Sequence, residues 1–357
     1  MTAGIYIHIP FCVRKCVYCD FLSFETTNFE EYVNALLREL KSAHFSAVDT
    51  VFIGGGTPTA LSSLFLCEIL KAVQEFPLLP DAEITVEVNP GTVDSEKLSA
   101  LKSHGVNRLS FGLQSTHDHL LRGLGRIHSF AQFKENFHAA QKAGFDNINI
   151  DLMFALPKQT LRDWKKTLAD VIALAPQHIS AYSLTPAENT PLTDSVSRGK
   201  IILPDDETDR IMYHEARRLL SDAGYSHYEI SNFAKPKFES KHNINCWTMK
   251  PYLGFGLGAH SFDGKTRWNN TENMNEYLNG NGKKNIFPLS EKEIISEKII
   301  LGLRLMNGVI EKQFAEIYQD EIAQLINDGL LQRQQNRIRL TPHGMDFANR
   351  VFSRFLF

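Results

Sequence analysis

The sequence lacks several features that would assign it to a class at once. No apolar run approaches the roughly 18 residues that suggest a membrane span. The segment Met1–Pro10 has neither the basic start nor the small-residue cleavage site of a signal peptide. An excess of one charge is also missing, because the formal net charge is only −3. We therefore expect a globular, cytoplasmic protein and do not expect nucleic acid as a partner.

Cysteine is scarce and unevenly distributed. The chain has 5 cysteines, and Cys12, Cys16 and Cys19 lie within one short segment. An odd count with this clustering argues against the disulfide framework of a secreted protein. In a reducing compartment, clustered thiols more often bind metal or perform chemistry. Cys67 lies in a helical pattern, and we interpret it as a packing residue.

The first part of the chain alternates short apolar or β-branched runs with amphipathic segments. Helical patterns cover residues 31–43 and 161–174, and Thr160 with Asp163 predicts a capping box for the latter. Strand–helix repeats imply a parallel sheet with right-handed crossovers. Periodicity does not decide between a partial barrel and an open sheet. The expected strands are Ile5–Ile9, Thr50–Ile53, Ile84–Val88, Arg108–Phe111, Ile148–Leu152 and His178–Ser183.

Glycine and polar residues collect at the carboxyl ends of these expected strands. Gly54–Pro58 follows the second strand, Glu87 and Asn89–Gly91 end the third, Gln114 follows the fourth, and Asp151 lies in the fifth. Parallel α/β folds bind ligands at this edge. Turns often carry such residues for structural reasons alone, which is how we interpret Asn89–Gly91. The triple glycine, Glu87 and Asp151 together predict a site.

Beyond about Asp205 the alternation stops. We divide the chain into a barrel over residues 1–205, an accessory region over 206–289 and a C-terminal module over 290–357. Within the accessory region, residues 269–284 are rich in Asn and Gly and are predicted to be a surface connection.

The C-terminal module shows a helix (321–327), two short strands (330–334 and 337–340) and a helix (344–355). This order predicts an α+β winged-helix-like fold. We interpret its arginines as a solvated face and not as a nucleic-acid surface. They are Arg337, Arg339, Arg350 and Arg354.

The cysteine spacing, Cys-X3-Cys-X2-Cys, lets one loop hold three corners of an iron–sulfur cubane and leaves the fourth iron without a protein ligand. The main alternative is zinc, which normally takes a fourth Cys or His. His8 is an uncertain fourth ligand because it lies along an expected strand. An open iron suits S-adenosyl-L-methionine (SAM), whose amino and carboxylate groups can chelate it while the protein positions and shields it.

This motif resembles the signature of the radical SAM superfamily, whose common fold is a partial (β/α)6 TIM-like barrel. Within that superfamily the chain is similar, over nearly its whole length, to the oxygen-independent coproporphyrinogen III oxidase-like family, which includes the HemW-type heme chaperones. The motifs that carry the resemblance are Tyr6–Cys12, Gly54–Thr59, Glu87–Gly91, Ser110–Gln114, Leu124–His128, Asp151–Pro157 and the segment from Leu301–Arg304 onward.

The resemblance implies an α/β fold with a [4Fe–4S] cluster on Cys12, Cys16 and Cys19. It also implies SAM as a second cofactor, with Thr185 a looser match to its site. The residues implied to line the SAM site are Tyr6, Gly55, Gly56, Thr57, Glu87, Gln114, Arg126 and Asp151.

Three features separate the relatives and favour the heme chaperones. Phe21 stands where the oxidase has a fourth cysteine, and the chain starts almost directly at the first expected strand. His242–Trp247 resembles the chaperones' His-Asn-X-X-Tyr-Trp motif, with Cys246 in place of tyrosine. His242 is the resulting candidate heme ligand, since imidazole is a reasonable axial ligand; Cys246 and His260 are alternatives.

The resemblance therefore implies a radical SAM protein that binds heme as cargo and delivers it to client hemoproteins. The first alternative is an enzyme that decarboxylates the propionates of coproporphyrinogen III or does another radical reaction on a tetrapyrrole. The second is a binding protein in which SAM is vestigial. Enzyme activity and dimerisation stay open, no catalytic residue is assigned, and any membrane association would come through the clients.

Overall fold

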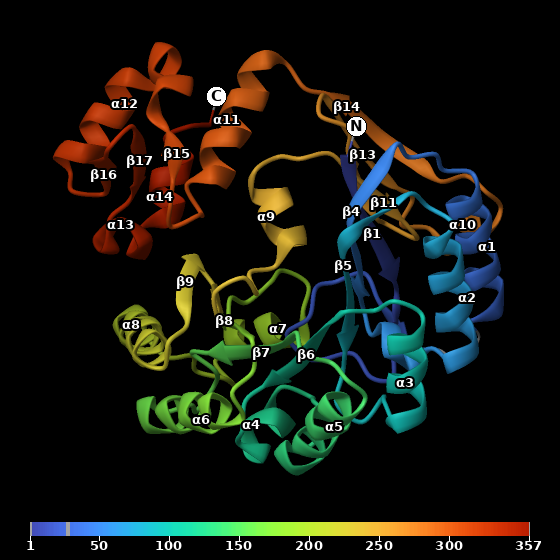
Figure 1. Ribbon diagram of the computed structural model, residues 1–357. Helices are drawn as coiled ribbons and strands as arrows, with labels where there is room; N and C mark the ends of the chain where they lie inside the picture. The colour runs from blue at the N-terminus through green and yellow to red at the C-terminus, as the bar shows by residue number, and fades with distance from the viewer. Residues whose placement is uncertain (1, 26–28, 357) are drawn as a thin grey trace.

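The computed structural model describes residues 2–25 and 29–356. Their largest feature is a 12-stranded sheet of order β14-β13-β12-β11-β1-β4-β5-β6-β7-β8-β10-β9 (Figure 1). Its central strands run parallel and curve into an open barrel, which confirms the expected partial barrel. They are β1 (Thr2–Ile9), β4 (Ala47–Gly55), β5 (Leu78–Val88), β6 (Arg108–Gln114), β7 (Ile148–Phe154) and β8 (His178–Ser183).

Helices cover the outer face of these strands (Figure 1). Their amphipathic patterns account for this packing, and the Thr160–Asp163 capping box at the start of α6 is present as expected. The elements are α1 (Glu30–Lys41), η1 (Pro58–Ala60), α2 (Ser63–Gln74), α3 (Ser95–Ser103), α4 (Asp118–Gly123), α5 (Phe130–Lys142), α6 (Leu161–Leu174), α7 (Pro191–Ser197) and α8 (Asp206–Asp222).

The two faces of the barrel strands differ in polarity. In β6, Leu109, Phe111 and Leu113 are buried under the helices, whereas the alternate residues point into the barrel. Those inward positions begin with Arg108 and continue with Ser110. The same alternation holds in its neighbours, so the barrel has an apolar outer layer and a polar interior.

The accessory region extends the sheet at both ends. Near the barrel's last strand lie β9 (Ser226–Glu229) and β10 (Asn232–Ala234), and the latter pairs antiparallel with β8. At the other end, β11 (Tyr252–Phe255) pairs parallel with β1. It is followed by β12 (His260–Phe262), β13 (Thr266–Asn270), α10 (Met274–Leu278) and β14 (Lys283–Pro288).

The expectation that residues 269–284 form a surface connection is therefore wrong. This stretch contains the end of β13, the whole of α10 and the start of β14. The strands form because β14 pairs antiparallel with β13, from Thr266↔Pro288 to Asn270↔Lys283. Local composition disfavours strands here, and pairing across the sheet overrides it.

The C-terminal module has a small sheet of order β15-β17-β16 packed with helices. One correction concerns the last expected helix, which is broken at Phe347 into two short helices. The elements are α11 (Glu291–Gly302), β15 (Val309–Ile310), η2 (Glu311–Gln313), α12 (Ala315–Asn327), β16 (Leu331–Gln334), β17 (Arg337–Leu340), α13 (Pro342–Asp346) and α14 (Ala348–Ser353).

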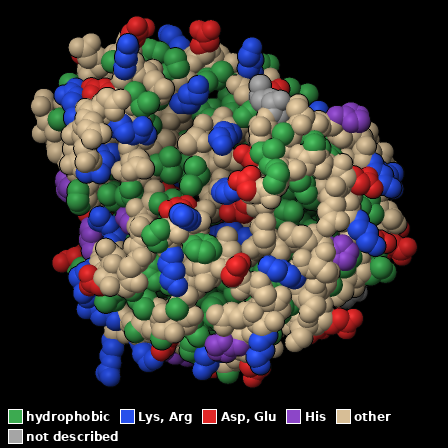
Figure 2. Space-filling view, in the orientation of Figure 1, with side chains coloured by type: hydrophobic (Ala, Val, Ile, Leu, Met, Phe, Trp, Pro, Cys, Tyr) green, Lys and Arg blue, Asp and Glu red, His purple; other side chains and the backbone are tan. Residues whose placement is uncertain are grey.

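Several basic side chains of this module serve the fold. Arg337 donates to the carbonyl oxygens of Asn307 and Gly308, at 2.7 and 2.6 Å. Arg354 donates to Gln324 at 3.1 Å. Figure 2 shows Lys and Arg side chains interspersed with acidic and apolar ones over this face of the molecule. In the described residues, no helix is long and apolar enough to cross a membrane.

A short helix, α9 (Lys241–Trp247), lies between the barrel and the C-terminal module (Figure 1). Its first turn is held by Glu83, whose carboxylate accepts hydrogen bonds from the backbone N–H groups of Lys241 and His242. Glu83 lies near the amino end of the barrel strands. Helix α9 therefore packs against the end of the barrel opposite the cysteine loop.

Candidate cofactor site

The three clustered cysteines lie on a loop that leaves the carboxyl end of β1. Two short parallel strands, β2 (Phe11–Cys12) and β3 (Phe24–Glu25), close the base of this loop. Its middle is tied to other elements through Val17, whose N–H donates to Leu124 O and whose carbonyl accepts from Leu192 N, at 3.1 and 2.9 Å. The loop is therefore positioned by backbone bonds on both sides.

Two of the sulfur atoms receive hydrogen bonds. Thr57 Oγ1 donates to Cys12 Sγ and Arg126 Nη1 donates to Cys16 Sγ, each at 3.6 Å. Asn89 joins these two donors, because its Nδ2 donates to Thr57 Oγ1 and its Oδ1 accepts from Arg126 Nη2. A continuous chain of hydrogen bonds thus connects two thiols that the sequence places on one cluster.

Burial is the main cause that raises the pKa of the Cys19 thiol to about 11. Iron binds the thiolate form, so ligation at this position is coupled to proton release.

The triple glycine forms a turn that passes close to the cysteine loop. Gly55 has φ +112°, a backbone conformation that side chains rarely adopt, and a Cβ there would lie 2.6 Å from the His8 ring. A Cβ on Gly56 would lie 2.7 Å from the carbonyl oxygen of Phe11. Thr57 N donates to that same oxygen at 2.7 Å. Only glycine therefore permits this approach.

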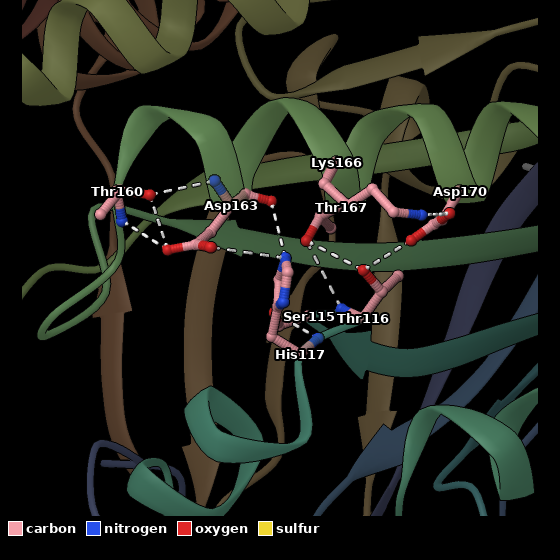
Figure 3. A network of polar contacts seen from close by, with 8 residues as sticks. All are labelled: Ser115, Thr116, His117, Thr160, Asp163, Lys166, Thr167 and Asp170. Atoms are coloured by element: carbon pink, nitrogen blue, oxygen red, sulfur yellow. Dashed lines mark hydrogen bonds and ion pairs between the residues drawn. The ribbon is translucent and has the colours of Figure 1, made fainter.

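A polar network fixes the turn that follows β6. Gln114 has φ +71°, and two of the three residues after it, Thr116 and His117, are bound to α6 (Figure 3). Thr116 Oγ1 shares a hydrogen bond with Thr167 Oγ1 at 3.2 Å, and the His117 ring bonds to the Asp163 carbonyl at 3.1 Å. This anchoring holds the carboxyl end of β6 beside the cysteine loop.

The cysteines, the glycine turn and the barrel interior enclose one cavity of about 590 Å³. Its wall is built from the inward-facing residues of β4 to β8 and closes toward α9. The predicted site residues that line it are Cys12, Cys16, Cys19, Gly55, Gly56, Thr57, Glu87, Gln114, Arg126 and Asp151.

Glu87 and Asp151 are acidic residues of the cavity wall, near the carboxyl ends of β5 and β7. Burial, followed by the charge of Asp151, raises the pKa of Glu87 to about 8, although the Gly55 N–H and Arg108 oppose this shift. Glu87 Oε2 accepts from Gly55 N at 3.1 Å. Asp151 accepts from Ser110 Oγ at 3.0 Å. Both carboxyl groups can accept from hydroxyl or ammonium donors of a ligand.

Other predicted residues lie outside this cavity. Tyr6 is hydrogen-bonded to His8 at 3.0 Å, and its ring stacks on Phe52. His242 is buried beneath the cavity, where Nδ1 shares a hydrogen bond with Thr50 Oγ1 at 3.0 Å and its ring also stacks on Phe52. Burial lowers the pKa of His242 to about 4.

The alternative heme-ligand candidates are also outside the cavity. Cys246 is partly buried, and burial raises the pKa of its thiol to about 11. His260 is exposed on β12. Thr185, the looser match to the SAM site, is exposed as well.

Sequence reasoning missed three residues that line the cavity at its end nearest α9, which we call the cavity floor. Arg108 begins β6, Trp247 ends α9, and Arg304 follows α11. Trp247 belongs to the recognised motif, and Arg108 was visible as a charged residue opening a buried strand. No signal joined them, because they meet only through the tertiary fold.

The arrangement of the three cysteine thiols can be compared with what a [4Fe–4S] cluster requires of its ligands. Three thiols face one cavity, and two of their sulfurs accept hydrogen bonds that offset thiolate charge. In the described residues, no group of three or more His, Cys, Asp or Glu side chains is gathered as the ligands of a single ion. Thiols that each bind a different iron of a cubane need no common centre. The residues present fit the [4Fe–4S] cluster.

Comparisons with known proteins agree with this site. Residues 6–171 match the Radical SAM superfamily, and residues 289–347 match the HemN C-terminal domain. The heme chaperone HemW of Lactococcus lactis subsp. lactis is 37% identical over 365 residues, which covers 98% of this chain and 96% of that protein. This chain belongs to the HemW family of radical SAM proteins. The heme chaperone HemW of Bacillus subtilis is also 37% identical, over 98% of both chains.

A solved structure shows that the fold is shared beyond the HemW family. Coproporphyrinogen III oxidase (HemN) from Escherichia coli superposes with a TM-score of 0.86 at 25% identity, covering 99% of this chain and 89% of that one. The radical SAM domain of the family implies a [4Fe–4S] cluster and SAM, and the cavity described above offers thiols and carboxylates for both.

Proposed function

We propose that this chain is a heme chaperone, which binds heme as cargo and passes it to client hemoproteins. The observation that carries the proposal is the 37% identity to HemW proteins over 98% of the chain. Phe21 supports it, because it lies at the cavity where the oxidase is expected to carry a fourth cysteine. All five cysteines are free, and three of them lie in a loop suited to a cluster. Both features support a cytoplasmic location.

In this proposal Cys12, Cys16 and Cys19 hold the cluster, and SAM lies against the glycine turn with Glu87 and Asp151. When bound, the cluster and SAM supply one-electron cleavage of a carbon–sulfur bond. Arg126 and Thr57 orient the sulfurs through their hydrogen bonds. Gln114 and Tyr6 complete the proposed SAM site, and for Tyr6 this role is indirect, through its contact with Phe52.

His242 is the proposed axial ligand of heme, and its position sets a condition on that role. The ring is buried between Phe52 and Gly4, and Nδ1 is bonded to Thr50. Its low pKa keeps the imidazole neutral, which is the form that binds iron. Heme can reach this ring only if the side chains packed around it rearrange.

The second candidate function is radical decarboxylation of coproporphyrinogen III, which the TM-score of 0.86 to HemN favours. One experiment separates the two functions. The protein is reconstituted with iron and sulfide without oxygen, and heme binding is followed by absorption titration. Transfer to an apo-hemoprotein, conversion of coproporphyrinogen III and release of 5′-deoxyadenosine are then measured on the same sample.

We expect stoichiometric heme binding and transfer, without conversion of coproporphyrinogen III. Conversion of the porphyrinogen without heme transfer would establish the second function and refute the first. A variant with serine at Cys12, Cys16 and Cys19 is the control, since serine is close to cysteine in size and removes the three thiolate ligands.

A further inference from the structure

The guanidinium of Arg108 is buried at the cavity floor without a counter-ion. Only 2% of the residue is exposed, and its side chain lines the cavity. Its Nε has no hydrogen-bond partner. Among the described residues, no carboxylate oxygen lies within 4.0 Å of the guanidinium. Arginine cannot lose its proton in a protein, so this charge is permanent.

The nearest acidic groups of the cavity do not neutralise Arg108. Asp151 accepts hydrogen bonds from the side chains of Ser110 and Asn149. Glu229 accepts from Ser231 N and pairs with another arginine. Glu87 has its pKa raised to about 8 and is largely protonated at neutral pH. A buried cation without a partner destabilises the fold. This indicates that the missing partner of Arg108 is an anionic ligand.

Other unpaired donors face the same floor. Within the part of the chain that the structure describes, the buried Nε1 of Trp247 and Nε of Arg304 have no hydrogen-bond partners. Both residues line the cavity with Arg108. Arg304 Cζ lies 4.3 Å from the centre of the Trp247 ring, and Arg304 Nη2 donates to Glu229 at 3.3 Å. These contacts hold the two donors in place. Each unpaired buried donor destabilises the fold, and a ligand acceptor would recover that loss.

The anion on this floor is not the carboxylate of SAM. Arg108 begins β6, whereas Gly112 lies level with Arg126 and the cysteine loop. Four residues of strand rise about 13 Å. In the proposed function the SAM carboxylate binds the open iron at the loop. The anion at Arg108 therefore belongs to a second ligand.

We propose that Arg108, with Trp247 and Arg304, forms a carboxylate subsite that holds a propionate of the tetrapyrrole cargo. This assignment rests on the proposed function and adds to it where the cargo is recognised. The planar guanidinium fork matches a carboxylate bidentately. A phosphate matches the fork as well, but its second charge would be repelled by the neighbouring Asp151 and Glu229.

The test compares metal-free protoporphyrin IX with its dimethyl ester, because these probes differ only at the two propionates, which are charged in the diacid and neutral methyl esters in the diester. Binding is measured by fluorescence titration on the reconstituted protein, on Arg108→Gln and on Arg108→Lys. Arg122→Gln is the matched control, since Arg122 is exposed at the end of α4. We expect the unsubstituted protein to bind the diacid about tenfold to a hundredfold more tightly than the diester. This ratio falls toward one in Arg108→Gln, is partly kept in Arg108→Lys and is unchanged in Arg122→Gln.

Equal affinity for diacid and diester in the unsubstituted protein would overturn the subsite, and this arm needs no variant to fold. Preserved discrimination in a folded Arg108→Gln protein would overturn it too. Heme binding and transfer are measured in parallel. Heme transfer without discrimination between the probes leaves the chaperone function standing and removes the subsite. Discrimination between the probes without heme transfer would leave the subsite standing and refute the chaperone function.

Discussion

At the scale of single residues, the polar side chains that donate hydrogen bonds to the cysteine sulfurs are themselves linked by hydrogen bonds. Asn89 lies in a turn that looked structural in sequence, yet it links Thr57 on Cys12 to Arg126 on Cys16. Hydrogen bonds to cluster sulfurs tune the potential of iron–sulfur centres. Asn89 is therefore a positioning residue, which acts through the two donors that it holds.

We expect Asn89→Ala to bind less cluster and to shift the cluster's midpoint potential, because both sulfur donors lose their common support. Iron and sulfide content and an electrochemical titration measure the effect. Asn281→Ala, at an exposed position, serves as the control. An unchanged potential at full cluster occupancy would show that Asn89 has no influence on the sulfurs.

Glu87 makes the stability of the protein depend on pH in a known direction. Its pKa rises from 4.5 to about 8 on folding, mainly through burial. Between these values the unfolded state has lost the proton and the folded state keeps it, so stability falls as pH rises. We expect cofactor-free Glu87→Gln to lose less stability than the unsubstituted protein between pH 5 and pH 8, by roughly 3 kcal/mol.

Urea denaturation at a series of pH values measures this difference. SAM affinity is measured alongside, and we expect it to fall in Glu87→Gln because an NH2 donor replaces one acceptor oxygen and the side chain can no longer carry a negative charge. Identical pH slopes in the two proteins would contradict the role of Glu87 in the stability profile.

At the scale of elements, α9 closes the amino end of the barrel and carries the motif of the accessory region. Its two notable side chains face different surroundings, since Trp247 lines the cavity and His242 stacks on Phe52 beneath it. A ligand role and a structural role for His242 therefore predict different consequences of its replacement.

We expect His242→Ala to lower heme affinity and to shift the Soret band of the remaining complex, because the axial ligand changes. Loss of the buried ring also destabilises the protein by roughly 2–4 kcal/mol. His260→Ala, at the exposed first residue of β12, is the comparison. A destabilised His242→Ala protein with an unchanged Soret band would assign the residue to structure alone.

At the scale of the whole molecule, the C-terminal module is joined to the barrel through a buried ion pair. Glu229 ends β9 with its side chain fully buried, and Arg304, which follows α11, donates to it at 3.3 Å. Burial raises the pKa of Glu229, which Arg304 counteracts. The pair connects the barrel's last strands to the start of the module and lies at the cavity floor.

We expect Arg304→Met to destabilise the protein by about 3 kcal/mol, because it leaves a buried carboxylate without its partner. The raised pKa makes this loss largest at high pH and small below the unfolded pKa of the carboxyl group. Thermal unfolding at several pH values measures it. The double variant with Glu229→Gln should recover much of the loss, and a double variant as unstable as Arg304→Met would disprove the coupling.

The predictable parts of this protein are those that short stretches of sequence determine. The cysteine spacing, the glycine turn and the strand–helix alternation are local patterns, and they predicted the parallel sheet and a site at the carboxyl ends of its strands. The choice of a partial barrel came from the resemblance to the radical SAM superfamily, because periodicity did not decide it. Residues 269–284 became part of the sheet because β13 and β14 pair with each other, which local composition does not reveal.

The cavity floor was decided only by the tertiary structure. Arg108, Trp247 and Arg304 lie on three elements far apart in the sequence, and each one alone has an ordinary structural explanation. Folding places them around one buried cavity, where the charge of Arg108 and the unpaired donors together form a candidate binding site. The cysteine loop could be read from sequence because its ligands are neighbours in the chain. The floor could not, because its recognition properties arise from burial and proximity.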